Sequence, residues 1–258
     1  MAMNSEPASR GTMSAVSERK SYSDWKRWSE EAFARPGSDE GRYFTLELSA
    51  SGVGPLQGRR VLEIGFGNGA FAGWALEAGA DYRGVEADPE LLARARGSGL
   101  RVMAAGQPLT EFAEEATVDL IVGFDVFEHV DRAVLPCLFR EMRTLLKPGG
   151  LLIGRVPSGD SPFGRVFQNG DLTHLTALGS EAVRQLAAMA GLEVVAVRGP
   201  VSPAAGGVRA RFRRAVKQGV RRLVYPVVAR LLMDWPGAVL TPNMVFVLRR
   251  SRTVAPPS

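Results

Sequence analysis

The stretch Val61-Leu62-Glu63-Ile64-Gly65-Phe66-Gly67-Asn68-Gly69 decides the fold of this chain. Its first four residues are mostly apolar and indicate the end of a buried strand. The three glycines at alternating positions allow a sharp turn and let a ligand approach bare backbone. A helix expected over residues 70–77 would present backbone N–H groups at its start. We therefore expect a nucleotide-like ligand to bind at this strand end.

The glycine spacing distinguishes between kinds of nucleotide ligand. Gly65-x-Gly67-x-Gly69 differs from the G-x-G-x-x-G of a dinucleotide site. Glu63, two residues before the first glycine, would repel a pyrophosphate and attract a cationic amino group. The pattern E-x-G-x-G-x-G resembles motif I of the class I S-adenosylmethionine-dependent methyltransferases; the alternative is a glycine turn that binds nothing. The resemblance implies cofactor contacts from Glu63, Gly65, Phe66, Gly67, Asn68 and Gly69.

A second acid ends the next expected strand, over residues 82–86. Glu86 lies about 20 residues beyond the glycine turn, where a carboxylate can accept hydrogen bonds from ribose hydroxyls. It is similar to the strand-two acid of the methyltransferase family, and Ala87 follows it in the implied cofactor site. Asp88 precedes Pro89, so we expect it to cap a helix rather than to bind ligand.

Residues 118–130 carry a third resemblance, to the family's D-x-x-E-H-V after strand four. The apolar run 118–124 predicts a buried strand. By the resemblance, Phe124, Asp125 and Val126 lie against the adenosine and the transferable methyl group. Many members carry an adenine-binding acid after strand three, which this chain lacks. There Gln107 could bond the adenine edge, or Gly106 could simply form a turn.

The alternation of strands and helices along the chain predicts a parallel sheet with helices on both faces. The resemblance implies an α/β, Rossmann-like doubly wound sheet of seven strands, with an antiparallel seventh strand between strands five and six. We expect a disordered tail over 1–22, a helical cap over 23–54, a methyltransferase domain over 55–250 with a basic helical insertion at 201–242, and a tail over 251–258. The aromatic helix of the cap either covers the active site or packs as ordinary core.

The single cysteine, Cys137, lies in a helix expected over residues 132–146 and is interpreted as a buried, inert thiol. One thiol forms no internal disulfide, which fits a reducing cytoplasm. The chain contains no uninterrupted apolar run of about 18 residues, so we expect no membrane span. Residues 1–21 lack the apolar stretch of a signal peptide. We therefore expect a cytoplasmic protein, with peripheral contact at the inner membrane face as a further hypothesis.

The net charge of +5 belongs to one segment. Nine Arg or Lys and no acid lie between Val194 and Met233, which leaves the rest of the chain at −4. Apolar and basic residues recur every four positions from Val208 onward, which predicts an amphipathic helix with a basic face. This helix is either a cap with a solvated charged face, or a contact through residues 208–235 with an anionic membrane or an acidic substrate.

The chain has only two histidines, and both are expected in loops at the carboxyl edge of the sheet. Methyl transfer from a sulfonium is a single in-line displacement, so the protein mainly aligns the acceptor with the methyl carbon. A hydroxyl acceptor must lose a proton, and His174 or His129 could take it. Each could instead brace its loop. Asp125, Glu128 and His129 offer metal ligands, as in the similar ubiquinone-pathway O-methyltransferases, but members without metal share this pattern and we expect none.

The sequence thus predicts an S-adenosylmethionine-dependent methyltransferase that O-methylates a small molecule, a glycan or a lipid-linked acceptor. A nucleic-acid methyltransferase is one alternative, suggested by the basic segment. Against it, Phe124-Asp125-Val126-Phe127 stands where N-methylating members usually carry [N/D]-P-P-[Y/F]. The other alternative is a cofactor-binding scaffold without catalysis.

Overall fold

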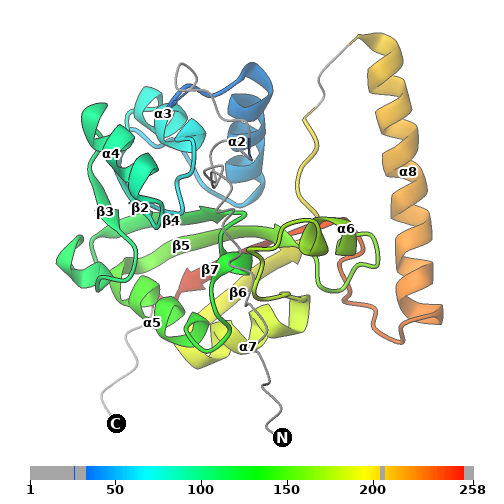
Figure 1. The fold of residues 1–258 in the computed structure, drawn as a ribbon. Helices are drawn as coiled ribbons and strands as arrows, with labels where there is room; N and C mark the ends of the chain where they lie inside the picture. Colours follow the sequence, from blue (N-terminus) through cyan, green and yellow to red (C-terminus); the bar gives the residue numbers. More distant parts are fainter. Residues whose placement is uncertain (1–25, 27–32, 204–206, 253–258) are drawn as a thin grey trace, which may run out of the picture.

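The computed structural model describes residue 26 and residues 33–203 and 207–252. A seven-stranded sheet with helices on both faces forms its centre (Figure 1). The strand order is β3-β2-β1-β4-β5-β7-β6. Strand β7 runs antiparallel to both of its neighbours, and the strand pairs from β3 to β5 are parallel. The predicted fold class and the place of the seventh strand are confirmed.

The strands are β1 Arg60–Ile64, β2 Asp81–Glu86, β3 Val102–Ala104, β4 Val118–Phe124, β5 Leu146–Pro157, β6 Leu192–Arg198 and β7 Asn243–Arg250. The helices are α2 Ser38–Ala50, α3 Ala70–Glu77, α4 Pro89–Gly97, α5 Leu135–Leu145, α6 Arg165–Asn169, α7 Ser180–Ala190 and α8 Val208–Leu231. The cap predicted over residues 23–54 is described only in part: Lys26 is helical, Phe33 lies in a turn, and α2 follows. The tail predicted over residues 1–22 lies outside the described residues.

The central strands are apolar on both faces because helices cover both. In β4, Leu120 and Val122 pack with α2 and α3, whereas Ile121 points to the opposite layer with α5 and α7. A strand buried on both faces has a continuous apolar sequence, as parallel sheets usually do. The same layering leaves the carboxyl ends of β1, β2 and β4 at one edge of the sheet, where the glycine turn of residues 65–69 lies.

Three local predictions differ from the structure. Helix α5 begins at Leu135 rather than at residue 132, because the Asp131 side chain accepts a hydrogen bond from Ala133 N and holds a turn there. The run 151–156 predicts a strand that begins at residue 151, but β5 begins at Leu146, since residues 146–150 continue the sheet through a register shift opposite β4. The interpretation of Cys137 as buried was wrong: it lies on the exposed side of α5.

Helix α8 stands beside the body of the molecule as a separate arm (Figure 1). The helix predicted from Val208 onward is confirmed, and it also includes part of the apolar run after residue 225. The chain leaves the sheet at the end of β6 and returns at the start of β7, where Arg198 pairs with Val245. No helix among the described residues combines the length and apolar character needed to cross a membrane.

Both ends of this arm are fastened to the body. Where it leaves, the buried Glu47 carboxylate accepts a hydrogen bond from Val201 N at 2.8 Å and pairs with Arg198. Where it returns, the Ser158 hydroxyl donates to Val239 O at 2.6 Å, and the Ser161 hydroxyl donates to Leu240 O at 2.8 Å. These bonds fix the base of the arm and leave the helix between them largely exposed.

Candidate functional site

A cavity of about 890 Å³ lies at the carboxyl ends of β1, β2 and β4. Loops that follow parallel strands form this edge of the sheet, so one cavity collects residues from distant parts of the sequence. Of the residues predicted for the site, those that line it are Glu63, Gly65, Phe66, Gly67, Asn68, Glu86, Ala87, Gln107, Phe124, Asp125, Val126 and His129. Gly69 and His174 do not line it.

The glycine turn has the backbone conformation that its sequence predicts. Gly65, Gly67 and Gly69 all have positive φ, at 70°, 53° and 74°. A β-carbon on Gly65 would overlap the side chain of Val126. Gly69 lies behind the turn as the residue that precedes α3, and a β-carbon there would press on the backbone of Ala34. Glycine is therefore required by conformation at each position and by close packing at two of them.

Glu86, at the end of β2, ties the glycine turn to the neighbouring loop. Its Oε2 accepts from Gly67 N at 2.9 Å, and its Oε1 accepts from Ala87 N at 2.7 Å and Asp88 N at 3.1 Å. A carboxylate has about four acceptor positions, so one remains for a ligand hydroxyl. Asp88 caps α4 through bonds from Glu90 N and Leu91 N, which confirms its structural role.

Glu63 lies deep in the cavity at the end of β1 and is 3% exposed. The Tyr82 hydroxyl donates to it at 2.6 Å. Burial raises the pKa of Glu63 to about 8, and the nearby Glu86 adds to this against the Tyr82 bond. A protonated Glu63 at neutral pH would give up its proton when a cation approaches, because a neighbouring positive charge favours the carboxylate.

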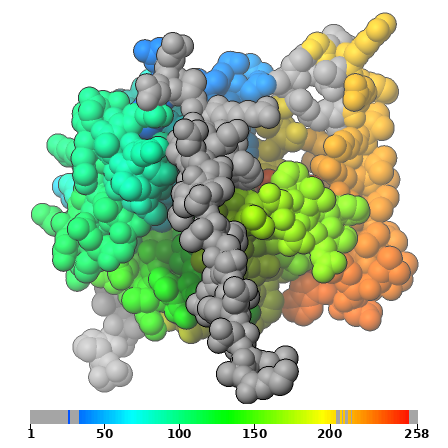
Figure 2. Space-filling view, in the orientation of Figure 1, coloured from blue at the N-terminus to red at the C-terminus, as the bar shows by residue number. Residues whose placement is uncertain are grey.

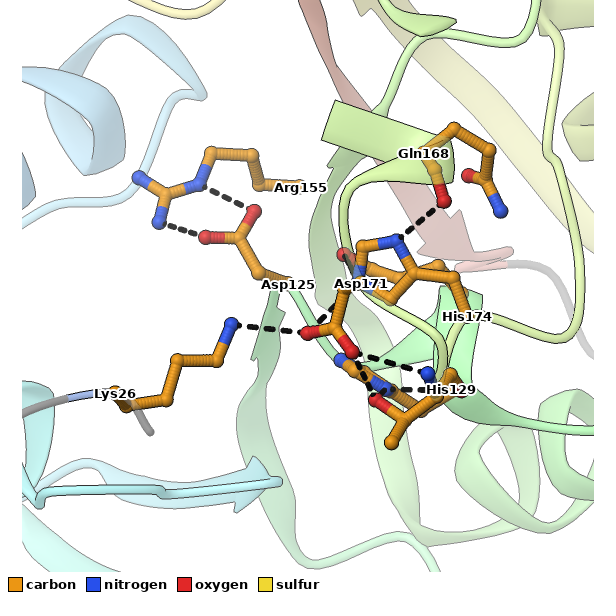
Figure 3. Close-up of polar contacts among 9 residues, drawn as sticks. Lys26, Asp125, His129, Arg155, Gln168, Asp171 and His174 are labelled. Carbon is orange, nitrogen blue, oxygen red and sulfur yellow. Dashed lines mark hydrogen bonds and ion pairs between the residues drawn. The ribbon is translucent and has the colours of Figure 1, made fainter. Parts of the chain in front are cut away.

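Asp125 and Arg155 form an ion pair across the ends of β4 and β5 (Figure 3). Asp125 has a positive φ of 56°, and its N–H donates to Arg155 O at 2.8 Å. The Arg155 guanidinium also lies over the rings of Tyr43, at 4.9 Å, and Phe124, at 5.5 Å. Burial opposes its charge, but Asp125 keeps the pKa of Arg155 above its usual value. This pair forms a charged wall beside the predicted adenosine and methyl region.

A chain of hydrogen bonds through Asp171 and Thr173 orients the His129 ring at its Nδ1 atom (Figure 3). Lys26 Nζ donates to Asp171 at 3.1 Å, and the Thr173 hydroxyl donates to Asp171 at 2.6 Å. Despite burial, the bonds from Thr173 and Lys26 lower the pKa of Asp171 to about 2. His129 Nδ1 lies 2.9 Å from Thr173 Oγ1 and 3.3 Å from Thr173 O.

This chain of bonds defines the tautomer of neutral His129. The Thr173 hydroxyl proton is engaged by Asp171, and a carbonyl only accepts, so Nδ1 must carry the proton that joins His129 to Thr173. Nε2 is then the basic nitrogen of the ring. Burial and the neighbouring His174 lower the pKa of His129, which favours the neutral form able to accept a proton.

His174 lies behind His129 rather than on the cavity wall. The two rings meet edge to face with centroids 4.5 Å apart, and the His174 side chain is 7% exposed. His174 Nδ1 donates to Gln168 O at 3.1 Å, which directs Nε2 toward Asp171 at 3.7 Å and Glu128 at 4.0 Å. Both predicted histidines are thus brought together, but only His129 reaches the cavity.

Glu128 completes this cluster. It is 1% exposed, and neither carboxylate oxygen has a hydrogen-bond partner among the described residues. Burial, and then Asp125, raises the pKa of Glu128 to about 8. Within the described part of the chain, ligand atoms of Glu128, His129 and His174 lie within 4.8 Å of one another, close enough to hold a cation. The expectation that no metal binds therefore stays a prediction.

Four residues of the site were not predicted from the sequence. Lys26, Thr173 and Arg155 line the cavity, and Asp171 supports the first two. Arg155 had a signal, as a lone charge in the apolar run 151–156. Lys26 had none, because its partner Asp171 is 145 residues away in the sequence.

Comparison with known proteins agrees with this geometry. Residues 24–197 match a family model described as a methyltransferase domain. A solved S-adenosylmethionine-dependent methyltransferase from Archaeoglobus fulgidus superposes with a TM-score of 0.59 at 16% identity, covering 88% of this chain and 97% of that one. Phosphoethanolamine N-methyltransferase 2 of Haemonchus contortus gives 0.56 at 17% identity, covering 90% and 60%. At these identities the likeness concerns the fold.

Closer sequence relatives share only part of the chain. An uncharacterized methyltransferase of Mycobacterium leprae is 38% identical over 124 residues, which cover 46% of this chain and 44% of that protein. The ubiquinone biosynthesis O-methyltransferase of Bordetella avium is 36% identical over 111 residues, covering 41% and 45%. The chain thus aligns with less than half the length of these relatives.

Proposed function

This chain belongs to the methyltransferase-domain family and has the fold of a class I S-adenosylmethionine-dependent methyltransferase; from this premise we propose that it methylates a hydroxyl oxygen. The acceptor in this proposal is a small molecule, a glycan or a lipid-linked compound. The observation that carries it is that His129 lines the same cavity as the glycine turn and Glu86. A hydroxyl acceptor must lose its proton and therefore needs a base beside the cofactor cavity. An acceptor that is already nucleophilic does not need one.

The cavity residues fit S-adenosylmethionine. Gly67 lines the cavity without a side chain, which suits close approach of the methionyl part. Glu63 can balance the cationic amino group, and the remaining acceptor position of Glu86 suits a ribose hydroxyl. Gln107 lines the cavity where the adenine edge is expected. The cofactor supplies the electrophilic methyl group, and the protein supplies its alignment.

His129 is the proposed base of the reaction. Its Nε2 would accept the acceptor's hydroxyl proton while the oxygen takes the methyl group, which S-adenosylmethionine would supply when bound, with a thioether as the leaving group. Asp171 and Thr173 support the resulting imidazolium through Nδ1, as an orienting carboxylate does for a catalytic histidine. His174, the first candidate from the sequence, is here a positioning residue that packs against the His129 ring.

The acceptor atom has support from one relative. The Bordetella protein is an O-methyltransferase, which supports oxygen as the acceptor atom. The solved neighbours include an enzyme named for N-methylation, so the fold alone does not choose the atom. A nucleic-acid methyltransferase and a cofactor-binding scaffold without catalysis are alternatives that the same assay separates.

The proposal is tested by a labelled-methyl transfer screen over sugar, phenolic, lipid-linked and RNA acceptors. With an accepted substrate, His129→Ala should lower kcat by about 10²–10⁴ while cofactor affinity stays unchanged. For the parent, kcat/KM should rise with pH through the His129 pKa, which lies below the usual value. Thr173→Val keeps the side-chain size and the carbonyl contact with His129 but removes the hydroxyl's bonds to His129 and Asp171, so an intermediate loss is expected.

Two outcomes would contradict this mechanism. Full turnover by His129→Ala on a genuine acceptor would exclude it as the base. Loss of turnover with a chelator, restored by Mg²⁺, would indicate that the Glu128, His129 and His174 cluster acts through a metal instead. Transfer to RNA alone would favour the nucleic-acid alternative, and cofactor binding without any transfer would favour the scaffold.

A further inference from the structure

Helix α8 presents its apolar side to solvent. Six residues fall within an arc of about 100° on the helix and are exposed: Phe212, Val216, Val220, Leu223, Val227 and Leu231. The side that faces the body is nearly opposite and holds the half-buried Tyr225 and the buried Ala229. A surface helix normally buries its apolar stripe. This one leaves it uncovered among the described residues.

A second exposed apolar segment adjoins α8. Residues 163–175 include α6 and carry Phe163, Val166, Phe167, Leu172 and Leu175, all exposed. Leu172 is 98% exposed. The rings of Phe163 and Tyr225 stack with centroids 6.4 Å apart, which joins this segment to α8. In Figure 2 the yellow-green surface of the segment borders the orange surface of the arm.

The charged side chains of α8 all have one sign. Arg209, Arg213 and Lys217 are exposed on α8, and no acid occurs between Val194 and Met233. Long basic side chains can lay their stems along an apolar surface and keep their charged ends in water. Trp235, 44% exposed just beyond the helix, suits the boundary between water and lipid. Apolar side chains mixed with basic ones fit an anionic headgroup layer.

We propose that α8 docks on an anionic lipid bilayer through its exposed apolar and basic side chains, and that residues 163–175, which meet α8 at Tyr225, carry further exposed apolar side chains to the same bilayer and bring the acceptor end of the cavity to it. The link to the cavity is short. Leu172 and Leu175 flank Thr173 and His174, and Thr173 lines the cavity and orients His129. A lipid-linked acceptor could then reach the base from the membrane. This second half of the proposal rests on the proposed function, whereas the docking does not.

Docking is tested by flotation of the full chain, without cofactor, on vesicles of phosphatidylcholine with about 30% phosphatidylglycerol. The parent should bind these vesicles, ignore pure phosphatidylcholine and dissociate as salt rises, because exposed charges are screened. Arg209→Glu, Arg213→Glu and Lys217→Glu together should weaken binding at least about 100-fold. The matched control reverses three exposed arginines on other helices, Arg96, Arg140 and Arg184, and should lose far less.

The apolar part has its own variants. Leu172→Ser with Leu223→Ser should weaken binding several-fold at both low and high salt, since burial of apolar surface is not screened. Leu76→Ser with Met189→Ser, exposed positions on α3 and α7, serves as the control and should bind like the parent. Brominated phosphatidylcholine should quench Trp235, seen as the difference between the parent and Trp235→Phe.

Several results would overturn the proposal. These are no flotation at low salt, equal losses in the two charge-reversed variants, or no effect of the Leu172 and Leu223 substitutions. A concentration-dependent dimer that the α8 substitutions abolish, without vesicle binding, would assign the surface to a second copy instead. Cofactor affinity, measured separately by calorimetry, reports on the proposed function, so a failure of docking and a failure of methyl transfer remain distinguishable.

Discussion

Gly67 is constrained both by its backbone conformation and by a hydrogen bond. Its φ of 53° is unfavourable for residues with a β-carbon, and its N–H donates to Glu86 at 2.9 Å. It also lines the cavity. The sequence predicts this position because alternating glycines directly after a buried strand are typical of a turn that a ligand approaches closely. The bond to Glu86 was not predictable, since it joins two loops that only the folded sheet brings together.

Gly67→Val should abolish binding of S-adenosylmethionine and of its demethylated product, because the side chain would occupy cavity space. Gly58→Val is the matched control: its φ is 70°, and a β-carbon there meets nothing within 4 Å. Both variants should lose about 1–2 kcal/mol of stability from the backbone conformation. Only Gly67→Val should fail in calorimetry, and the parent should not bind NAD. Retained affinity would show that the turn is not the cofactor site.

Glu63 should make the stability of the chain depend on pH. Its pKa is raised from 4.5 to about 8, so between these values the folded chain keeps a proton that the unfolded chain has released. Stability should therefore fall as pH rises from about 5 to 8. Glu63→Gln removes this contribution and should flatten the slope of unfolding free energy against pH, measured by urea titration. Glu128 acts in the same direction, so a residual slope is expected; an unchanged slope would mean that Glu63 stays ionised.

At the level of elements, the strands were more predictable than the loops. The apolar runs predict β1, β2 and β4 to within a residue at each end, because a strand covered on both faces needs apolar residues throughout. The start of β5 was missed, since Lys147 and Pro148 suggest a turn while the backbone continues along β4. Pairing across strands is a property of the sheet and leaves little mark on the local sequence.

The loops were less predictable, because contacts between distant segments determine their conformation. Residues 171–176 are held by Glu128, whose carbonyl accepts from Leu175 N at 2.8 Å and Thr176 N at 3.0 Å. The Thr176 hydroxyl also donates to Val130 O at 2.8 Å. The sequence predicted that both histidines lie at this edge of the sheet. Which of them reaches the cavity depends on these contacts between loops, and those are not encoded by spacing within either loop.

At the scale of the whole molecule, the chain consists of a methyltransferase fold and one arm. The arm begins and ends beside the paired residues Arg198 and Val245, so it is an insertion into a connection between two neighbouring strands. Its fastenings at Glu47, Ser158 and Ser161 are buried, whereas the helix between them is mostly exposed. Composition predicted this division, because the positive charge of the chain is confined to the same segment.

Replacing residues 204–236 by a short Gly-Ser linker should therefore separate the two parts. The core should fold and bind S-adenosylmethionine within about threefold of the parent, because among the replaced residues whose burial the structure describes only Ala229 is buried. The longer loop between the fastenings is replaced by a shorter one, so the cost of chain closure changes by less than about 1 kcal/mol. Vesicle flotation should be lost, and calorimetry and thermal melting give the other readouts. Inserting the same linker at residues 204–206 with α8 retained is the control, and it should float like the parent. If the shortened chain fails to fold, the arm is needed for the stability of the core. The division of the chain into a methyltransferase fold and a separate arm would then be wrong.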